Sequence, residues 1–249
     1  MLISAIIITK NEEKNIRRCL RSLHDWIDEI VIIDSGSTDN TLKICREYTQ
    51  RVFSMDWPGF GPQKNRALNL AQGTWVLSLD ADEWVSLALK KEILQAIPNL
   101  DYHGYRMPRR NMFCGRFQRF GDAAKDKVLR IFQKQFGQFT EDLVHEKVIC
   151  DGTIGLLKNP LLHNSSRTEP EWRAQMEKYA KLAAQLRYHQ GKRSTFFKAV
   201  VNSGWIFFRS YCLRMGFLDG KIGFLFAKLN AKYSFQKNIE IRRLRRIKS

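Results

Sequence analysis

The first hundred residues alternate between apolar runs and amphipathic segments. The apolar runs are short and rich in Ile, Val and Leu, which is typical of strands that are buried on both faces. They lie at residues 2–9, 29–34, 51–55 and 74–80. The intervening segments carry apolar residues at helical spacing and lie at residues 10–23, 41–48, 64–72 and 86–97. Strands that alternate with single helices predict an α/β domain with a parallel sheet covered on both faces.

The pattern changes after residue 100. From 101 to 163 short apolar pieces alternate with loops, and we expect them to complete the sheet. Beyond Pro170 the chain is helical, with a periodic apolar face on the first helix, at Trp172, Met176, Tyr179, Leu182, Ala183 and Leu186. Gly73 is placed to end the third helix of the first part. The sequence therefore predicts an α/β domain at 1–165 and a helical extension at 166–249.

Positive charge is concentrated in the helical part. The chain has a formal net charge of +17, and residues 161–249 contain 19 Lys and Arg against 5 Asp and Glu. This excess predicts an anionic partner, either a nucleic acid or a membrane surface. The longest uncharged stretch of the helical part, 199–208, is well short of the roughly 20 residues of a membrane span. Aromatic residues among Lys and Arg favour a helix in the lipid headgroup region; the alternative is a docked helical hairpin with solvated charges.

Composition excludes several classes of protein. With 44% hydrophobic residues and 12% aromatic residues, the chain has material for a core and is not a disordered segment. Its five cysteines include no C-x-x-C pair, which argues against a disulfide framework or a zinc site and fits a reducing cytosol. The apolar run at the N-terminus has no basic segment before it, so we interpret it as a core strand.

Acidic residues follow three of the predicted strands. They form the segments Thr9–Glu12, Asp34–Asp39 and Asp80–Glu83. Because ligands bind at the carboxyl ends of parallel strands, we expect these segments to meet at one crevice. Asp80 and Asp82 form a D-x-D pattern that suits Mg²⁺ or Mn²⁺, and such an ion would bridge a diphosphate.

Other polar residues near the strand ends have two interpretations. Asp34 would accept hydrogen bonds from a base or a ribose, or it caps the turn that contains Asp39. Lys64 and Arg66 would meet a phosphate, or they are solvated surface cations. The sequence contains no Gly-rich phosphate loop of the G-x-G-x-x-G or Walker A type, so a metal ion is the expected way to handle phosphate charge.

Two later sites add titratable groups. Residues 141–146 contain three carboxylates and a histidine, and one of these carboxylates is a candidate general base for an acceptor hydroxyl. His163 follows at the end of a predicted strand. It is either a structural histidine or a ligand at an open position of the metal.

These motifs resemble those of the family 2 glycosyltransferases, which have the GT-A fold. The resemblance rests on the order and spacing of Thr9-Lys10-Asn11-Glu12, Asp34-Ser35-Gly36-Ser37-Thr38-Asp39 and Asp80-Ala81-Asp82-Glu83. The rest of the chain resembles one branch of that family, the lipopolysaccharide-core β-1,4-glucosyltransferases. The branch-level motifs are Val144-His145-Glu146, Ile154–His163, Gly216–Gly220 and Gly223-Phe224.

The resemblance implies a role for each matching residue. Thr9, Glu12 and Asp34 would hold the donor nucleotide, and we add Lys64 as a donor-binding candidate. Asp80 and Asp82 would hold the metal and the sugar diphosphate, with Asp82 the more direct ligand, and His163 would be a third metal ligand. The base would be Glu146, from the His-Glu pair of the branch, with Asp142 as the alternative.

The implied reaction is an inverting, metal-dependent hexosyl transfer. The donor would be UDP-glucose and the acceptor a heptose of the lipid A–core precursor. Residues 1–165 would be the catalytic domain, and 166–249 would bind the anionic cytoplasmic face of the bacterial inner membrane. The alternatives are a nucleotide-sugar transferase for another cell-envelope glycan, a nucleotidyltransferase that releases pyrophosphate, or a basic nucleic-acid-binding protein.

Overall fold

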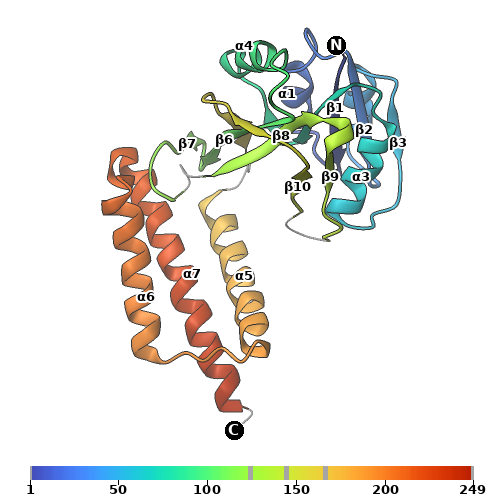
Figure 1. Ribbon diagram of the computed structural model, residues 1–249. Coiled ribbons are helices and arrows are strands. Elements are labelled where there is room, and N and C mark those ends of the chain that lie inside the picture. The colour runs from blue at the N-terminus through green and yellow to red at the C-terminus, as the bar shows by residue number, and fades with distance from the viewer. Residues whose placement is uncertain (1, 123–125, 143–145, 165–167, 248–249) are drawn as a thin grey trace. The chain divides into compact units, whose positions relative to one another are not determined.

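The computed structural model describes residues 2–122, 126–142, 146–164 and 168–247 (Figure 1). The chain divides into two compact units. Unit 1 contains residues 1–109 and 126–164, and unit 2 contains residues 110–125 and 165–249. Unit 2 thus includes the helical extension expected from residue 166 onward and, in addition, a segment from the middle of the chain.

Unit 1 is built on parallel strands near the N-terminus. In spatial order they are β3 (Val52–Ser54), β2 (Glu29–Asp34), β1 (Ile3–Thr9) and β4 (Trp75–Asp80). Every pairing among them is parallel, which confirms the sheet predicted from their apolar runs. All seven residues of β1 are buried, because this strand lies in the middle of the parallel group.

Later strands extend this sheet and add a small second one. Next to β4 lie the antiparallel strands β8 (Lys127–Gln133) and β6 (Gly104–Phe113), and the sheet continues through β12 (Leu161–Asn164) to β5 (Glu83–Trp84). Two short strands, β7 (Arg116–Phe117) and β11 (Ile154–Leu156), pair with β6. The second sheet contains β9 (Gly137–Phe139) and β10 (Val148–Cys150). The short apolar pieces between 101 and 163 therefore do form strands.

Helices cover both faces of the parallel strands. They are α1 (Ile16–Arg21), α2 (Thr41–Arg46), α3 (Phe60–Leu70) and α4 (Leu87–Ala96). Alternate residues of β1 point to opposite faces. Ile7 belongs to the core that includes α1, α2 and α4, whereas Ile6 and Ile8 belong to the core formed with α3. The mixed α/β architecture predicted from the sequence is confirmed.

Helix α3 differs from its prediction at both ends. It begins at Phe60, four residues early, because Pro62 falls in its first turn, where a missing N–H costs no hydrogen bond. It ends at Leu70, so the prediction that Gly73 stops it is wrong. Gly73 instead allows a close backbone approach, because a Cβ atom there would lie 2.7 Å from the backbone nitrogen of Ser4.

Unit 2 consists mainly of helices. They are α5 (Glu169–His189), α6 (Phe196–Phe208), η3 (Arg209–Leu213), η4 (Gly216–Asp219) and α7 (Gly220–Ile247). The long helix α7 packs against both α5 and α6 (Figure 1). Helix α5 buries the small residues Ala180 and Ala184, while Tyr179, Leu182 and Leu186 of its predicted apolar face are exposed. No helix in the described ranges is long and apolar enough to cross a membrane.

Residues 110–122 belong to unit 2 because polar contacts tie them to the helices. Asp122 forms ion pairs with Arg209 and Arg214. A carboxylate oxygen of Asp219 accepts a hydrogen bond from the backbone N–H of Arg119 at 3.0 Å. These contacts join segments that lie 87 to 100 residues apart in sequence, and no local pattern signals them.

Candidate active site

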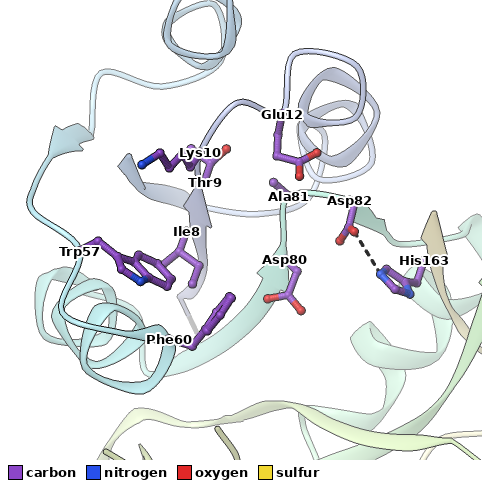
Figure 2. A pocket seen from close by; sticks show the side chains of 10 residues that line it. All are labelled: Ile8, Thr9, Lys10, Glu12, Trp57, Phe60, Asp80, Ala81, Asp82 and His163. Atoms are coloured by element: carbon purple, nitrogen blue, oxygen red, sulfur yellow. Dashed lines mark hydrogen bonds and ion pairs between the residues drawn. The ribbon is translucent and has the colours of Figure 1, made fainter. Parts of the chain in front are cut away.

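A cleft of about 430 Å³ opens at the carboxyl ends of β1 and β4 (Figure 2). The strand register explains its position, because Thr9 pairs with Asp34 and Ile8 pairs with Asp80, so that β1, β2 and β4 end together. The lining residues are Ile8, Thr9, Lys10, Glu12, Trp57, Phe60, Asp80, Ala81, Asp82 and His163. Five of the residues singled out from the sequence therefore share one cleft: Thr9, Glu12, Asp80, Asp82 and His163.

Asp82 and His163 meet although 81 residues separate them in sequence. Strand β12 pairs antiparallel with β5, and this pairing sets His163 opposite Glu83. Nε2 of His163 lies 3.1 Å from a carboxylate oxygen of Asp82 (Figure 2). The backbone N–H of Asn164 also donates to the carbonyl oxygen of Asp82 at 2.9 Å. Backbone hydrogen bonds between β12 and the segment around β5 thus hold Asp82 and His163 in place, and such paired backbone is more rigid than a loop.

Carboxylates gather on the side of the cleft where Asp82 meets His163. Burial opposes the imidazolium form of His163, but the hydrogen bond and the charge of Asp82 outweigh it and raise the pKa of that histidine. Burial raises the pKa of Glu12, and the charge of Asp82 adds to this effect, while a hydrogen bond from Asn15 opposes it. Neighbouring carboxylates that disfavour each other's ionised form make a site that gains from a bound cation.

Asp82 and His163 fit a divalent metal ion. A carboxylate oxygen and an imidazole nitrogen at one wall of the cleft form a mixed donor pair that suits Mn²⁺. Within the described ranges no group of three His, Cys, Asp or Glu side chains is arranged to hold a metal. Such ions are commonly held by one or two protein ligands, with substrate phosphate and water completing the coordination. Two protein ligands beside a cleft of about 430 Å³ are therefore sufficient for such an ion.

Asp80 is bound differently from Asp82. One carboxylate oxygen lies 2.7 Å from Nζ of Lys64, and the other lies 2.6 Å from the guanidinium of Arg130. Burial opposes the ionised form of Asp80, but the charges of Arg130 and Lys64 hold the pKa of this carboxyl well below its usual range. Both oxygens are thus occupied by protein cations in this arrangement.

Lys64 connects the cleft to the candidate base Glu146. Its side chain is buried, and Nζ lies 2.6 Å from a carboxylate oxygen of Glu146. Neither residue lines the cleft, but Lys64 contacts Asp80, which does. Asp142, the alternative base, is exposed, and its carbonyl oxygen accepts a hydrogen bond from the N–H of Gly61 at 3.1 Å. Val144 and His145 of the same motif lie outside the described residues.

Asp34 is fully buried within its own turn. One carboxylate oxygen accepts hydrogen bonds from the backbone N–H groups of Gly36 and Ser37, both at 2.9 Å. Asp39 accepts from the N–H of Thr41 at the start of α2. Both aspartates hold the loop that follows β2, and neither lines the cleft. Arg66, the other candidate cation, forms an exposed ion pair with Asp56.

The sequence did not reveal the cations that neutralise this site. Arg130 lies 2.8 Å from Glu83, which is fully buried, and Arg109 lies 3.4 Å from the same carboxylate. Arg109 also pairs with Asp126 at 2.7 Å. One signal was present, because Arg130 interrupts the apolar run VLRIF, and a charge among buried strand residues requires a partner.

Replacing Arg130 by methionine is expected to lower the free energy of unfolding by about 3 kcal/mol, because Glu83 is left buried with little compensation. Urea denaturation would measure the loss. Arg173→Met is the matched control, since the ion pair of Arg173 with Glu169 is exposed on α5 and is worth about 1 kcal/mol or less. Equal losses in the two variants would show that the buried network is not a major source of stability.

The arrangement of strands and cleft defines an α/β transferase fold of the GT-A type. A crystal structure of S. aureus TarS, residues 1–349, has the same fold, with a TM-score of 0.50 at 17% identity, covering 100% of this chain and 92% of that one. The chain belongs to glycosyl transferase family 2, whose family model matches residues 4–161.

Two curated relatives match nearly the whole chain. The lipopolysaccharide core biosynthesis glycosyltransferase LpsC of Rhizobium meliloti is 30% identical, with 95% of this chain and 93% of the relative covered. An uncharacterized glycosyltransferase of Rickettsia typhi is 30% identical over 97% of this chain and 87% of its own length. The family, the fold and the class of enzyme predicted from the sequence are confirmed: the chain is a glycosyltransferase.

Proposed function

We propose that this protein transfers glucose from UDP-glucose to a heptose of the lipopolysaccharide inner core, with inversion at the anomeric carbon. The observation that carries the proposal is the cleft at the ends of β1 and β4, where Thr9, Glu12, Asp82 and His163 face one space. The similarity to a lipopolysaccharide core glycosyltransferase supports the acceptor. A transferase for another cell-envelope glycan is the nearest alternative.

The donor would occupy the cleft with its diphosphate near Asp82. Asp82 and His163 would hold Mg²⁺ or Mn²⁺, which supplies positive charge to the departing nucleoside diphosphate. Thr9 and Glu12 would contact the nucleotide at the end of β1. In this proposal Asp34 and Lys64 act from behind the cleft, where Asp34 shapes the loop after β2 and Lys64 fixes the carboxylate of Asp80.

Glu146 is our proposed base, with Asp142 as the alternative. Its carboxylate pairs with Lys64, which also pairs with the cleft residue Asp80, and this link to the cleft supports Glu146 as the base. On substrate binding the carboxylate would accept the proton of the heptose hydroxyl as that oxygen attacks the sugar. Attack opposite to the leaving diphosphate converts an α-linked donor into a β-linked product.

We also propose that unit 2 brings the enzyme to its acceptor. The acceptor is carried by lipid A, and residues 161–249 have a large excess of Lys and Arg. Such a surface suits the anionic cytoplasmic face of the bacterial inner membrane. The enzyme would then be a peripheral protein of that face.

The test is release of UDP from UDP-glucose, UDP-galactose and UDP-GlcNAc, each with Mn²⁺ or EDTA and with or without a heptose-containing core acceptor. We expect release to require both metal and acceptor, with UDP-glucose the preferred donor and at least a tenfold loss in EDTA, as is typical when a charge-stabilising group is removed. Preference for another sugar would reassign the donor. Turnover that needs no metal would remove Asp82 and His163 from the proposed role.

A further inference from the structure

Helix α6 is apolar on its outer face as well as on the face that packs against α7, where Ala199 is buried and Phe207 contacts Phe224. Its exposed side chains include Phe197, Val201, Trp205 and Phe208, which recur at intervals of three or four residues and therefore share one face. Their exposed fractions lie between 48% and 77%. On a surface helix the polar residues should face solvent, yet on α6 the polar Asn202 and Ser203 are partly buried.

Nothing in the described part of unit 2 covers this apolar face. Helix α7 packs on the opposite side of α6, where Ala199 is completely buried. In η3 and η4, which follow α6 in the chain, Leu213, Phe217 and Leu218 are also exposed. A helix face of large apolar side chains at this exposure indicates a binding surface.

The charges of unit 2 indicate what this surface binds. Each acidic side chain in the unit is engaged within it, by an ion pair, by backbone N–H groups or by a helix cap: Asp122, Glu169, Glu171, Glu177, Asp219 and Glu240. Lys192, Arg193 and Lys198 stand at the start of α6, are exposed, and make no ion pair with the described residues. Positive charge beside an apolar face complements an anionic lipid surface.

We propose that the outer face of α6 inserts into the interface of an anionic lipid bilayer. Phe197, Trp205 and Phe208 would lie among the upper acyl chains, while Lys192 and Lys198 would contact lipid phosphates. The helix axis would lie along the membrane plane. This inference rests on the membrane location in the proposed function. It adds that the outer face of α6 is the surface that contacts the bilayer, and that burial of apolar side chains contributes to binding as well as charge.

A second copy of this chain is the competing occupant of the apolar face. Two copies with parallel α6 helices would bring the cations at the start of α6 close to one another, and a dimer of either orientation would leave these cations without anionic partners on that face. A bilayer with anionic headgroups removes that cost. The experiment below therefore measures the oligomeric state as well as lipid binding.

The test uses the full chain and vesicles of phosphatidylethanolamine with phosphatidylglycerol. The variant Phe197→Ser, Trp205→Ser, Phe208→Ser removes the apolar face. The matched control is Tyr179→Ser, Leu182→Ser, Leu186→Ser, which removes three exposed apolar side chains from α5. We expect the α6 variant to lose at least tenfold in partitioning, because each aromatic side chain contributes buried apolar area. The α5 control should sediment like the wild type.

Salt separates insertion from simple electrostatic attraction. Wild-type binding should persist in part at 0.5 M NaCl, whereas contacts between charges alone are screened. Acyl-chain brominated lipids should quench wild-type tryptophan fluorescence more than that of Trp205→Phe, a variant that keeps an apolar side chain. Wild-type-like vesicle binding by the α6 variant would overturn the inference. A lipid-free dimer that the α6 variant converts to a monomer would assign the face to self-association instead.

The inference and the proposed function fail in different ways. With a delipidated, water-soluble core acceptor, the α6 variant should release UDP at the wild-type rate. If the wild type inserts through α6 but turns over no UDP-sugar, the proposed function is wrong and the surface assignment stands. If UDP release is normal and the α6 variant still binds vesicles fully, the surface assignment is wrong.

Discussion

Replacing Asp82 by asparagine is expected to slow sugar transfer roughly a thousandfold. The amide keeps the shape of the side chain but removes the negative charge from the pair that Asp82 forms with His163. A weaker metal site would leave the charge of the departing diphosphate less stabilised. UDP release at increasing Mn²⁺ should show a lower maximal rate and a higher concentration for half-maximal activity.

Asp56→Asn is the matched control for this variant. Asp56 immediately precedes the cleft residue Trp57 in the chain, but its carboxylate is exposed and pairs with Arg66 on the surface. Its substitution should leave the rate within about twofold of wild type, as expected for an exposed ion pair of low energy. If Asp82→Asn also retained wild-type activity and wild-type Mn²⁺ dependence, Asp82 would not be a metal ligand.

Replacing Glu146 by glutamine is expected to lower kcat about 10²–10⁴-fold if Glu146 is the base. The donor KM should change little, because neither Glu146 nor its partner Lys64 lines the cleft. The variant leaves the buried Lys64 with Asp80 as its charged partner, so stability has to be measured alongside activity. Single-turnover rates with saturating donor would separate loss of chemistry from loss of binding.

Asp142→Asn provides the comparison between the two candidate bases. Asp142 is exposed, and the contact of its backbone with Gly61 does not involve the carboxylate. We expect this variant to keep most of its activity, whereas Glu146→Gln should lose it. The reverse result would assign the base to Asp142, and the same loss in both would mean that both carboxylates contribute to the rate.

The main elements of unit 1 follow from local sequence. Apolar runs between short helices predict parallel strands, because burial of both faces leaves no room for polar residues. Since parallel strands end at one edge, the positions of Thr9 and Asp80 in sequence were sufficient to predict that they meet. The D-x-D pattern and its neighbours also carried the resemblance to the family that the whole-chain comparisons confirm.

The electrostatic state of the site depended on contacts between distant segments. Asp80 and Asp82 are nearly adjacent in the chain, yet Asp80 is neutralised by Lys64 and Arg130 while Asp82 meets His163. Sequence spacing treats the two aspartates alike. The pairing of β4 with β8 and of β5 with β12, together with the packing of α3 on the sheet, separates their environments.

The sequence alone determined the strand order along the chain, the acidic cluster at the sheet edge, the family and the basic helical extension, because each depends on residue type and local periodicity. Tertiary structure decided which aspartate meets His163, which one pairs with Lys64 and Arg130, and that residues 110–122 join the helical unit. It also decided that one apolar face of α6 stays exposed. These features depend on which surfaces pack together, and periodicity shows that a helix has an apolar face without showing what covers it.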